Sequence, residues 1–342
     1  FIAAHAKGHT IVIEKSTMPV RAADRVKSIL ASAGPGVTFD ILSNPEFLAE
    51  GTAIRDLEQP DRVLIGGERP EPIAALAEIY RRWVPAERVL STDLWSAELS
   101  KLVANAFLAQ RVSSINSISA LCEVTGADIE EVASVIGTDS RIGPKFLRAS
   151  VGFGGSCFQK DLLSLIYISE SYGLTEVAAY WQQVVDLNQW QKHRFADQIA
   201  APIATAEGSL RGRRIAILGF AFKKDTNDVR ETPAIDVCRR LLARGATLAV
   251  HDYKVTPDSV ASEIGTQGVE VAATPEAALA GADGVAVLTE WSAYAKLDWA
   301  RLAGMLKAGA VIYDGRNIVD ATAVRRAGLT LRSIGRGAQP NA

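Results

Sequence analysis

One cysteine stands in a setting that favours nucleophilic chemistry. Cys157 follows the glycine-dense run Gly152-Phe153-Gly154-Gly155-Ser156 and shortly precedes Lys160 and Asp161. If a helix begins after this run, the cysteine lies at its N-terminus beside a lysine, and both features favour the thiolate form. A thiolate attacks carbonyl carbon, and glycines allow a close approach of backbone to a ligand. The ordinary alternative is a small buried cysteine in a turn, and the local pattern alone supports both interpretations equally.

A second polar pair, Lys101 and Asn105, lies four positions apart in a stretch, residues 95–124, that contains neither glycine nor proline. Apolar residues recur there with helical spacing, so the pair shares one face of a long helix. Partly buried, the two side chains would stabilise an oxyanion or donate to a substrate. On spacing alone, a solvated polar edge is the favoured alternative.

Residues 44–51, Asn-Pro-Glu-Phe-Leu-Ala-Glu-Gly, follow the end of an expected strand. Ligands bind at loops on the carboxyl edge of a parallel sheet. Glu46 and Glu50 could therefore do acid–base work there. Acidic residues that begin an ordinary helix are the equally supported alternative.

Two basic loops follow expected strands nearer the C-terminus. One carries Lys223 and Arg230, and the other carries Arg316. Lysine and arginine at such loops can clamp a phosphate. A solvated charged loop is the favoured alternative for each one alone, although two such loops at one sheet edge are less easily dismissed.

Cys122 and Cys238 fall within helical patterns and are expected in the core.

An α/β chain must position these residues. Strand and helix signals alternate over residues 10–92, and a second βαβ pattern begins at residue 213. We expect two Rossmann-like, doubly wound domains joined by a central helical block with a long helix: residues 1–92, 93–210 and 211–335, with a disordered tail at 336–342. The expected strands cover residues 10–14, 37–42, 62–65, 213–219, 247–252, 284–289 and 310–314. The expected helices cover residues 19–33, 72–83, 95–124, 128–136, 160–172, 175–201 and 233–244.

Composition excludes several partners and sites. A net charge of -2 and a pI of about 6.2 give no basis for binding nucleic acid or a membrane surface. No apolar run is long enough to span a bilayer. Three cysteines argue against a disulfide scaffold and fit a reducing compartment. Four scattered histidines form no zinc pattern, so we expect no metal.

The start of the chain lacks an expected feature. Dinucleotide binding is announced by G-x-G-x-x-G after a strand, and this motif does not occur. Residues 1–9 resemble the end of a helix, and a parallel sheet does not begin inside an α/β unit. We therefore expect the N-terminal domain to be incomplete, as in an N-terminal truncation.

Taken together, the motifs resemble one family. The runs at residues 14–20, 43–51, 105–107, 152–157 and 219–223 are similar, in this order, to those of the UDP-glucose/GDP-mannose dehydrogenase family. The resemblance extends from residue 10 to about residue 335. It implies NAD-dependent oxidation of UDP-glucose to UDP-glucuronate in two hydride transfers. The alternatives are a related enzyme acting on GDP-mannose or UDP-N-acetylmannosamine, and a non-catalytic fragment that binds a sugar nucleotide.

The resemblance assigns roles to individual residues. Cys157 would attack the intermediate aldehyde and pass through a thiohemiacetal and a thioester, while Lys101 would stabilise the oxyanion. Asp161, Glu46 and Thr17 would orient or activate water. Asn105 would join Lys101 on the substrate. The implied substrate contacts are Phe47, Leu48, Arg141 (reaching a neighbouring subunit), Phe146, Leu147, Arg148, Ser150, Gly152, Phe153, Gly154, Phe222, Lys223 and Arg316. The implied NAD contacts are Ser16, Thr17, Glu50, Lys160 and Arg230.

The sparse cysteines favour a cytoplasmic location, and the helical middle together with the resemblance suggests a homodimer or larger homo-oligomer. The missing glycine motif, and the missing acidic residue that would contact the adenosine ribose, predict that this chain alone turns over UDP-glucose weakly or not at all.

Overall fold

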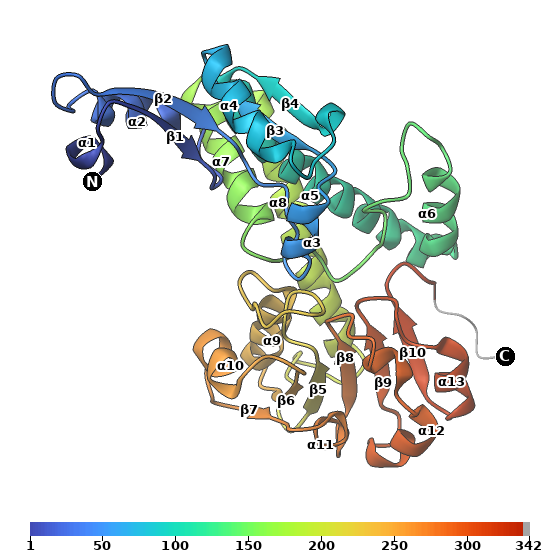
Figure 1. Ribbon diagram of the computed structural model, residues 1–342. Coiled ribbons are helices and arrows are strands. Elements are labelled where there is room, and N and C mark those ends of the chain that lie inside the picture. Colours follow the sequence, from blue (N-terminus) through green and yellow to red (C-terminus); the bar gives the residue numbers. More distant parts are fainter. Residues whose placement is uncertain (338–342) are drawn as a thin grey trace. The chain divides into compact units, whose positions relative to one another are not determined.

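The computed structural model describes residues 1–337, which form two compact units (Figure 1). Unit 1 comprises Phe1–Phe107 and Asp161–Ala178, and unit 2 comprises Leu108–Lys160 and the chain from Ala179 onward. Three helices cross these boundaries: α5 (Leu94–Thr125), α7 (Phe158–Ser171) and α8 (Thr175–Ala200). The sequence predicted three domains with boundaries at positions other than those of the two units, and that division stays a prediction.

Unit 1 is built on a four-stranded sheet in the order β1-β2-β3-β4. Its strands are β1 (His9–Glu14), β2 (Thr38–Ser43), β3 (Val63–Gly66) and β4 (Val89–Thr92). Strands β1 and β2 pair in parallel, as do β3 and β4, whereas β2 meets β3 antiparallel at Ser43 and Gly66. The sheet is therefore mostly parallel, as expected, and β1 and β2 end at the same edge.

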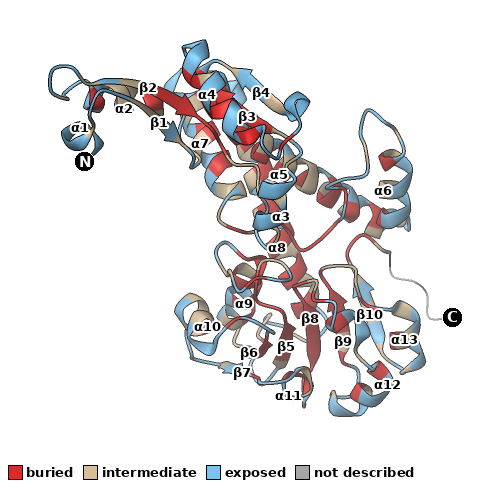
Figure 2. Cartoon of the chain, in the orientation of Figure 1, coloured by how far each residue is buried: buried red, intermediate tan, exposed pale blue. Residues whose placement is uncertain are grey.

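Helices cover this sheet and complete the core of unit 1. The buried side chains of Leu42, Ile65, Leu76 and Tyr80 pack together between strands and helix α4. Figure 2 shows these buried stretches in red. Besides the first part of α5 and most of α7, the helical elements are α1 (Ile2–His5), α2 (Ala22–Leu30), α3 (Ala53–Glu58), α4 (Pro70–Tyr80) and the 3-10 turn Ala86–Arg88.

Unit 2 contains a six-stranded parallel sheet in the order β10-β9-β8-β5-β6-β7. The chain fills one side of β5 first and then the other, beginning at β8. This is the doubly wound arrangement expected from the sequence, and ligands of such sheets bind where the direction reverses. The strands are β5 (Arg214–Leu218), β6 (Thr247–His251), β7 (Val269–Val271), β8 (Gly284–Val287), β9 (Val311–Asp314) and β10 (Thr330–Ser333).

Strong start signals define several helices of unit 2. Thr232, Thr256 and Thr274 each cap a helix through the side-chain oxygen, and a proline follows each threonine.

In residues 1–337 no helix is both long enough and apolar enough to cross a membrane. Besides parts of α5, α7 and α8, the helices are α6 (Ile129–Gly137), α9 (Pro233–Ala243), α10 (Pro257–Ile264), α11 (Pro275–Leu279), α12 (Trp299–Leu302) and α13 (Ala321–Arg326), with 3-10 turns at Tyr294–Lys296 and Ala303–Met305.

The start of the predicted tail is ordered. The amide of Ile129 donates to the carbonyl of Gly335 over 3.0 Å, and Arg336 forms an ion pair of 3.1 Å with Asp128. The prediction of a disordered tail at 336–342 is therefore wrong for Arg336, because this residue binds the start of α6. Residues 338–342 lie outside the described part of the chain.

Candidate active site

Unit 1 brings together three polar side chains that the sequence singled out. Lys101 and Asn105 lie one turn apart on α5 and are 6% and 8% exposed, so the alternative of a solvated polar edge is wrong. Asn105 Nδ2 donates to Asp161 Oδ2 over 2.5 Å. Asp161 lies in the first turn of α7 and is 1% exposed. A lysine, an amide and a carboxylate are thus buried in one unit, where charges act more strongly than in water.

The loop after β2 adds to this group. Two cations lie close to the Phe47 ring, with Lys101 Nζ 5.4 Å and the Arg62 guanidinium 3.8 Å from its centroid. Lys15, which follows β1, donates to the carbonyl of Asn44 over 3.3 Å. Burial lowers the pKa of Lys15, nearby Glu46 partly opposes this shift, and Lys101 adds to it. The ends of the parallel strands β1 and β2 therefore bring Phe47 and Glu46 toward basic side chains.

Sequence reasoning missed a pair of carboxyl groups beside the end of β1. Glu98 of α5 accepts hydrogen bonds from the backbone amides of Arg21 and Ala23 at the start of α2, over 2.6 and 3.0 Å. Burial and the neighbouring Glu98 raise the pKa of Glu14 to about 7. Burial also raises the pKa of Glu98. The sequence signal that could have revealed this pair is Glu14, a glutamate at the end of a strand of β-branched residues. The pair favours retention of a proton at Glu14 at neutral pH.

The other predicted residues of this edge lie closer to solvent. Ser16 and Glu50 are exposed, while Thr17 and Leu48 are half-buried. They follow β1 and β2, as the sequence predicted.

Cys157 directly precedes α7, so the predicted helix begins two residues earlier than expected and the cysteine stands at its N-terminus. Its side chain is exposed, whereas Cys122 and Cys238 are buried. The alternative of a buried cysteine is therefore wrong for Cys157, and the core positions expected for the other two are confirmed. Lys160 and Asp161 follow in the first turn of the helix. Among residues 1–337, no three His, Cys, Asp or Glu side chains are grouped so that they could hold a metal ion.

The glycine-rich segment before Cys157 lies in unit 2 against the loop that follows β5. A Cβ atom added at Gly155 would lie 2.9 Å from the Phe222 ring, so only glycine allows this approach. The amide of Gly155 donates to the carbonyl of Arg230 over 3.0 Å. The structure therefore brings Phe222 and the backbone of Arg230 to the glycine run. The Arg230 side chain itself is paired with Asp228 over 2.7 Å.

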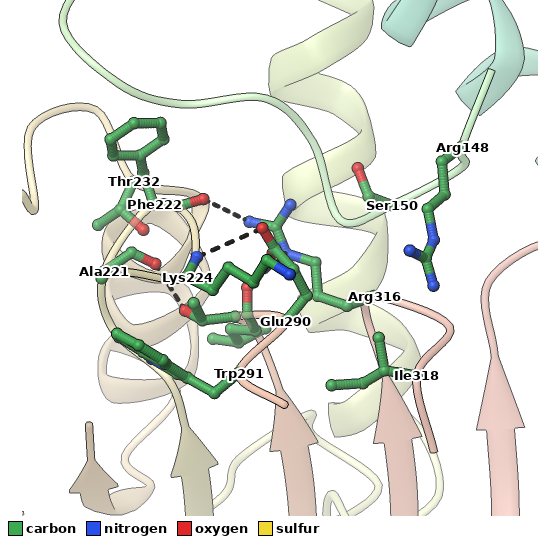
Figure 3. Close-up of polar contacts among 12 residues, drawn as sticks. Arg148, Ser150, Ala221, Phe222, Lys224, Thr232, Glu290, Trp291, Arg316 and Ile318 are labelled. Carbon is green, nitrogen blue, oxygen red and sulfur yellow. Dashed lines mark hydrogen bonds and ion pairs between the residues drawn. The ribbon is translucent and has the colours of Figure 1, made fainter. Parts of the chain in front are cut away.

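The loops after β5, β8 and β9 meet where the sheet of unit 2 changes direction (Figure 3). Arg316 was expected to contact the substrate, but its side chain is only 12% exposed. Nε donates to the carbonyl of Leu288 over 2.6 Å, and Nη2 donates to the carbonyl of Phe222 over 2.9 Å. Glu290 accepts from the Lys224 amide and lies 3.4 Å from Arg316. In the structure, Arg316 therefore ties these loops together.

The remaining predicted substrate residues differ in exposure. Leu147 and Ser150 are buried, whereas Phe146 is 41% exposed with a φ of 61°. Arg148 donates to the carbonyl of Asn317 over 3.2 Å. The side chain of Arg141 is 87% exposed and pairs with Asp139 over 2.6 Å. Lys223 lies 5.2 Å above the Phe222 ring.

Comparison with known proteins identifies the family. Residues 1–84, 95–190 and 216–321 match the NAD binding, central and UDP binding domains of the UDP-glucose/GDP-mannose dehydrogenase family. UDP-glucose 6-dehydrogenase 1 of Oryza sativa subsp. japonica is 52% identical, over 98% of this chain and 74% of the relative. The chain belongs to the UDP-glucose/GDP-mannose dehydrogenase family.

Further relatives agree with this family membership. UDP-glucose 6-dehydrogenase 1 of Glycine max is 50% identical, over 99% of this chain and 75% of its own length. The solved UDP-glucose dehydrogenase of Pyrobaculum islandicum superposes with a TM-score of 0.84 at 34% identity, over 96% of this chain and 71% of that one. As a member of this family, the chain is an NAD-dependent oxidoreductase with an α/β fold.

The family comparison corrects one expectation. The NAD binding domain of the family matches residues 1–84 although G-x-G-x-x-G is absent from the chain. The prediction that the N-terminal domain is incomplete is therefore not supported. It rested on the missing glycine motif and acidic residue and on the resemblance of residues 1–9 to the end of a helix.

Proposed function

We propose that this chain oxidises UDP-glucose to UDP-glucuronate, with Cys157 as the nucleophile. One observation carries the proposal. Asp161 is buried and bonded to Asn105, and Asn105 lies one turn from Lys101 on α5. The exposed Cys157 directly precedes α7, the helix that bears Asp161. The relatives named UDP-glucose 6-dehydrogenase support the choice of substrate.

The reaction divides into four steps. The C6 alcohol first loses a hydride and a proton and becomes an aldehyde. The Cys157 thiolate adds to that aldehyde, and Lys101 stabilises the resulting oxyanion. The thiohemiacetal loses a second hydride and becomes a thioester. Water then cleaves the C–S bond, leaving a carboxylate and the free thiol. Asp161, Glu46 and Thr17 orient or deprotonate water, and Asn105 holds Asp161 in place.

The residues at the shared edge of β1 and β2 fit a nicotinamide cofactor. Ser16 and Thr17 offer hydroxyl groups and Glu50 a carboxylate, and these groups suit ribose hydroxyls and a carboxamide. These residues would hold two NAD molecules in turn, and each molecule would supply the acceptor for one of the two hydrides. Lys160 and Arg230 are the further proposed contacts.

The UDP part is assigned to the loops of unit 2. Support comes from the family's UDP binding domain, which matches residues 216–321, and from the direction change of the sheet at β5 and β8. Arg148 and the half-buried Phe222 lie on segments at or beside this edge (Figure 3). Lys223 follows Phe222 in the loop after β5. The further proposed substrate contacts are the loop at residues 146–154 in unit 2 and, separately, Phe47 and Leu48 in unit 1.

Replacement of the nucleophile tests the mechanism. The chain, its Cys157→Ser variant and a Cys122→Ala control are incubated with UDP-glucose and NAD, and UDP-glucuronate is measured by chromatography. We expect the serine variant to form uronate at least about 100-fold more slowly, because a hydroxyl is a poorer nucleophile than a thiolate. The control should match the wild type. Uronate formation by Cys157→Ser at the wild-type rate would refute the thioester route.

Substrate choice is tested in the same assay with GDP-mannose and UDP-N-acetylmannosamine. UDP-glucose should give the highest kcat/KM of the three. Failure of all three to react, with UDP binding retained, would favour a non-catalytic sugar-nucleotide-binding protein. The weak turnover expected from the missing glycine motif stays a prediction, as does a cytoplasmic location.

We also propose that the chain forms a homodimer or a larger homo-oligomer. Support comes from large apolar side chains exposed on the helices of unit 2: Leu121 and Val124 of α5 are 55% and 82% exposed, and Val135 of α6 is 70% exposed. Light scattering during gel filtration measures the mass. The proposal fails if the mass is that of a monomer at micromolar concentration.

A further inference from the structure

A row of buried polar side chains on α8 faces the glycine-rich segment that leads to Cys157. Asn188, Gln191 and Lys192 have the spacing of one helix face and are 2%, 0% and 1% exposed. None of them was singled out from the sequence. Buried polar groups are retained where they have defined partners, and here the partners of Asn188 and Gln191 are backbone groups of residues 150–153.

Asn188 binds both polar groups of a single residue. Its Oδ1 accepts from the amide of Phe153 over 2.9 Å, and its Nδ2 donates to the carbonyl of Phe153 over 3.1 Å. Only this orientation of the side-chain amide satisfies both bonds. The arrangement copies the pairing of two strands and fixes the position of Phe153.

The neighbouring residues are fixed in the same way. Gln191 Nε2 donates to the carbonyl of Ser150 over 2.9 Å, and Asn116 Oδ1 accepts from the amide of Ser150 over 2.8 Å. Gly152 has a φ of 131°, and an added Cβ would lie 2.9 Å from Asn188 Oδ1. The glycine therefore allows the backbone to lie directly on the asparagine.

A short chain of contacts leads from Asn188 to the cysteine. The Phe153 ring packs edge-on against Phe158, with centroids 5.8 Å apart. Phe158 is the first residue of α7 and the next residue after Cys157. Two glycines, Gly154 and Gly155, separate Phe153 from Ser156, and glycine does little to hold a backbone in one conformation. The bond from the Gly155 amide to the carbonyl of Arg230 holds one point of this segment, and Asn188 supplies the fixed point before the glycines.

We propose that Asn188 is a positioning residue for Cys157. By holding Phe153, it keeps Phe158 and the start of α7 in place and so sets the cysteine at the helix N-terminus. This role rests on the proposed function of Cys157 as the nucleophile. Asn188 is assigned this role through Phe153, whose amide and carbonyl it binds.

The test uses the reactivity of the thiol, which can be measured without substrate. Because Cys157 is exposed and the other two cysteines are buried, iodoacetamide should label Cys157 selectively, and peptide mass spectrometry gives the rate. In Asn188→Ala the rate at pH 7 should change about fivefold, because the residues around Cys157 lose the fixed position that Phe153 and Phe158 give them. The kcat for UDP-glucose oxidation should fall about tenfold. Asn188→Asp keeps the shape of the side chain and replaces the donor to the Phe153 carbonyl with an acceptor, so it should show the same changes. It takes the place of the alanine variant if that variant does not fold.

Gln198→Ala is the matched control. Gln198 lies on the same helix, and its side chain donates to Glu123 over 2.7 Å rather than to the glycine-rich segment. It should lower the melting temperature while leaving alkylation of Cys157 unchanged. The proposal is overturned if Cys157 in both Asn188→Ala and Asn188→Asp is alkylated at a rate within about twofold of wild type. It is also overturned if the rate changes no more than in the control. The outcome is separate from that of the proposed function, because full activity of Cys157→Ser would disprove the thioester route and leave the alkylation result intact.

Discussion

The side-chain amide of Asn105 is bonded to the carboxylate of Asp161 over 2.5 Å, although 56 residues separate them in the sequence. Both side chains are almost fully buried. The bond joins α5 to the first turn of α7 within unit 1. It fixes a carboxylate near the buried lysine of α5, which is the arrangement that the proposed oxidation needs.

Removing the amide should destabilise the protein. In Asn105→Leu, the buried carboxylate of Asp161 loses a hydrogen-bond donor, so the free energy of unfolding should fall by about 2 kcal/mol. Urea unfolding followed by tryptophan fluorescence measures the change. Gln110→Leu, on a more exposed part of α5, is the control and should change stability by less than about 0.5 kcal/mol. Equal stability of Asn105→Leu and wild type would contradict the assigned bond.

Glu14 should make the stability of the protein depend on pH. Its pKa in the folded state, about 7, lies above the ordinary value of 4.5. The folded state therefore holds a proton that the unfolded chain has released, so stability is highest below about pH 4.5 and falls as pH rises to about 7. Glu14→Gln has no such titration. It should match wild type near pH 4.5 and exceed it at pH 8 by roughly 1 kcal/mol, a value reduced for solvent screening of this partly exposed group.

The comparison for Glu14 is urea unfolding at the two pH values. Glu58→Gln changes an exposed carboxyl group in the same unit and should leave the pH dependence of the wild type in place. A constant difference between Glu14→Gln and wild type at both pH values would rule out the titration.

Gly154→Ala should disrupt the segment before Cys157. An added Cβ would lie 2.4 Å from the carbonyl oxygen of Glu231, which is too close for any real contact and involves backbone that cannot rotate away. We expect a loss of about 3 kcal/mol in stability, measured by thermal unfolding. Gly304→Ala is the control, since an added Cβ there meets no atom within 4 Å. If both variants melt at the wild-type temperature, the close approach at Gly154 is wrong.

Arg316→Lys should weaken both the fold of unit 2 and its binding of UDP. A lysine cannot reproduce two directed bonds to the carbonyls of Leu288 and Phe222. Stability should fall by about 1 to 3 kcal/mol, and the Kd for UDP, measured by calorimetry, should rise. Lys223→Ala should raise the Kd with a much smaller effect on melting. A raised Kd for Arg316→Lys without any loss of stability would instead indicate direct contact with the ligand.

The elements that the sequence predicted well carry strong local signals. The helix expected at 95–124 is observed as Leu94–Thr125, because no glycine or proline interrupts it. The strand expected at 247–252 is observed as Thr247–His251. Short elements such as α3 and β7 were missed, since so few residues leave little periodicity to detect.

Side-chain partners across the sequence were harder to predict. Nothing local distinguishes Asn188 from other polar residues of a long helix, and its role appears only when residues 150–153 lie against it. Arg316 was correctly placed on a loop at the sheet edge, but the carbonyls that hold its guanidinium come from two other loops. The carboxyl pair near β1 arises from residues 14 and 98, whose proximity depends on the packing of α5.

Unit 1 is assembled from two separate stretches of chain, Phe1–Phe107 and Asp161–Ala178. A ribosome makes the first stretch, then enters sequence belonging to unit 2, and only afterwards produces α7. Until then the nascent chain presents Asn105 and its neighbours on α5 without the helix that covers them. Unit 1 therefore cannot complete its core until residues 161–178 have emerged, and until then the nascent chain exposes apolar surface of the kind that promotes aggregation.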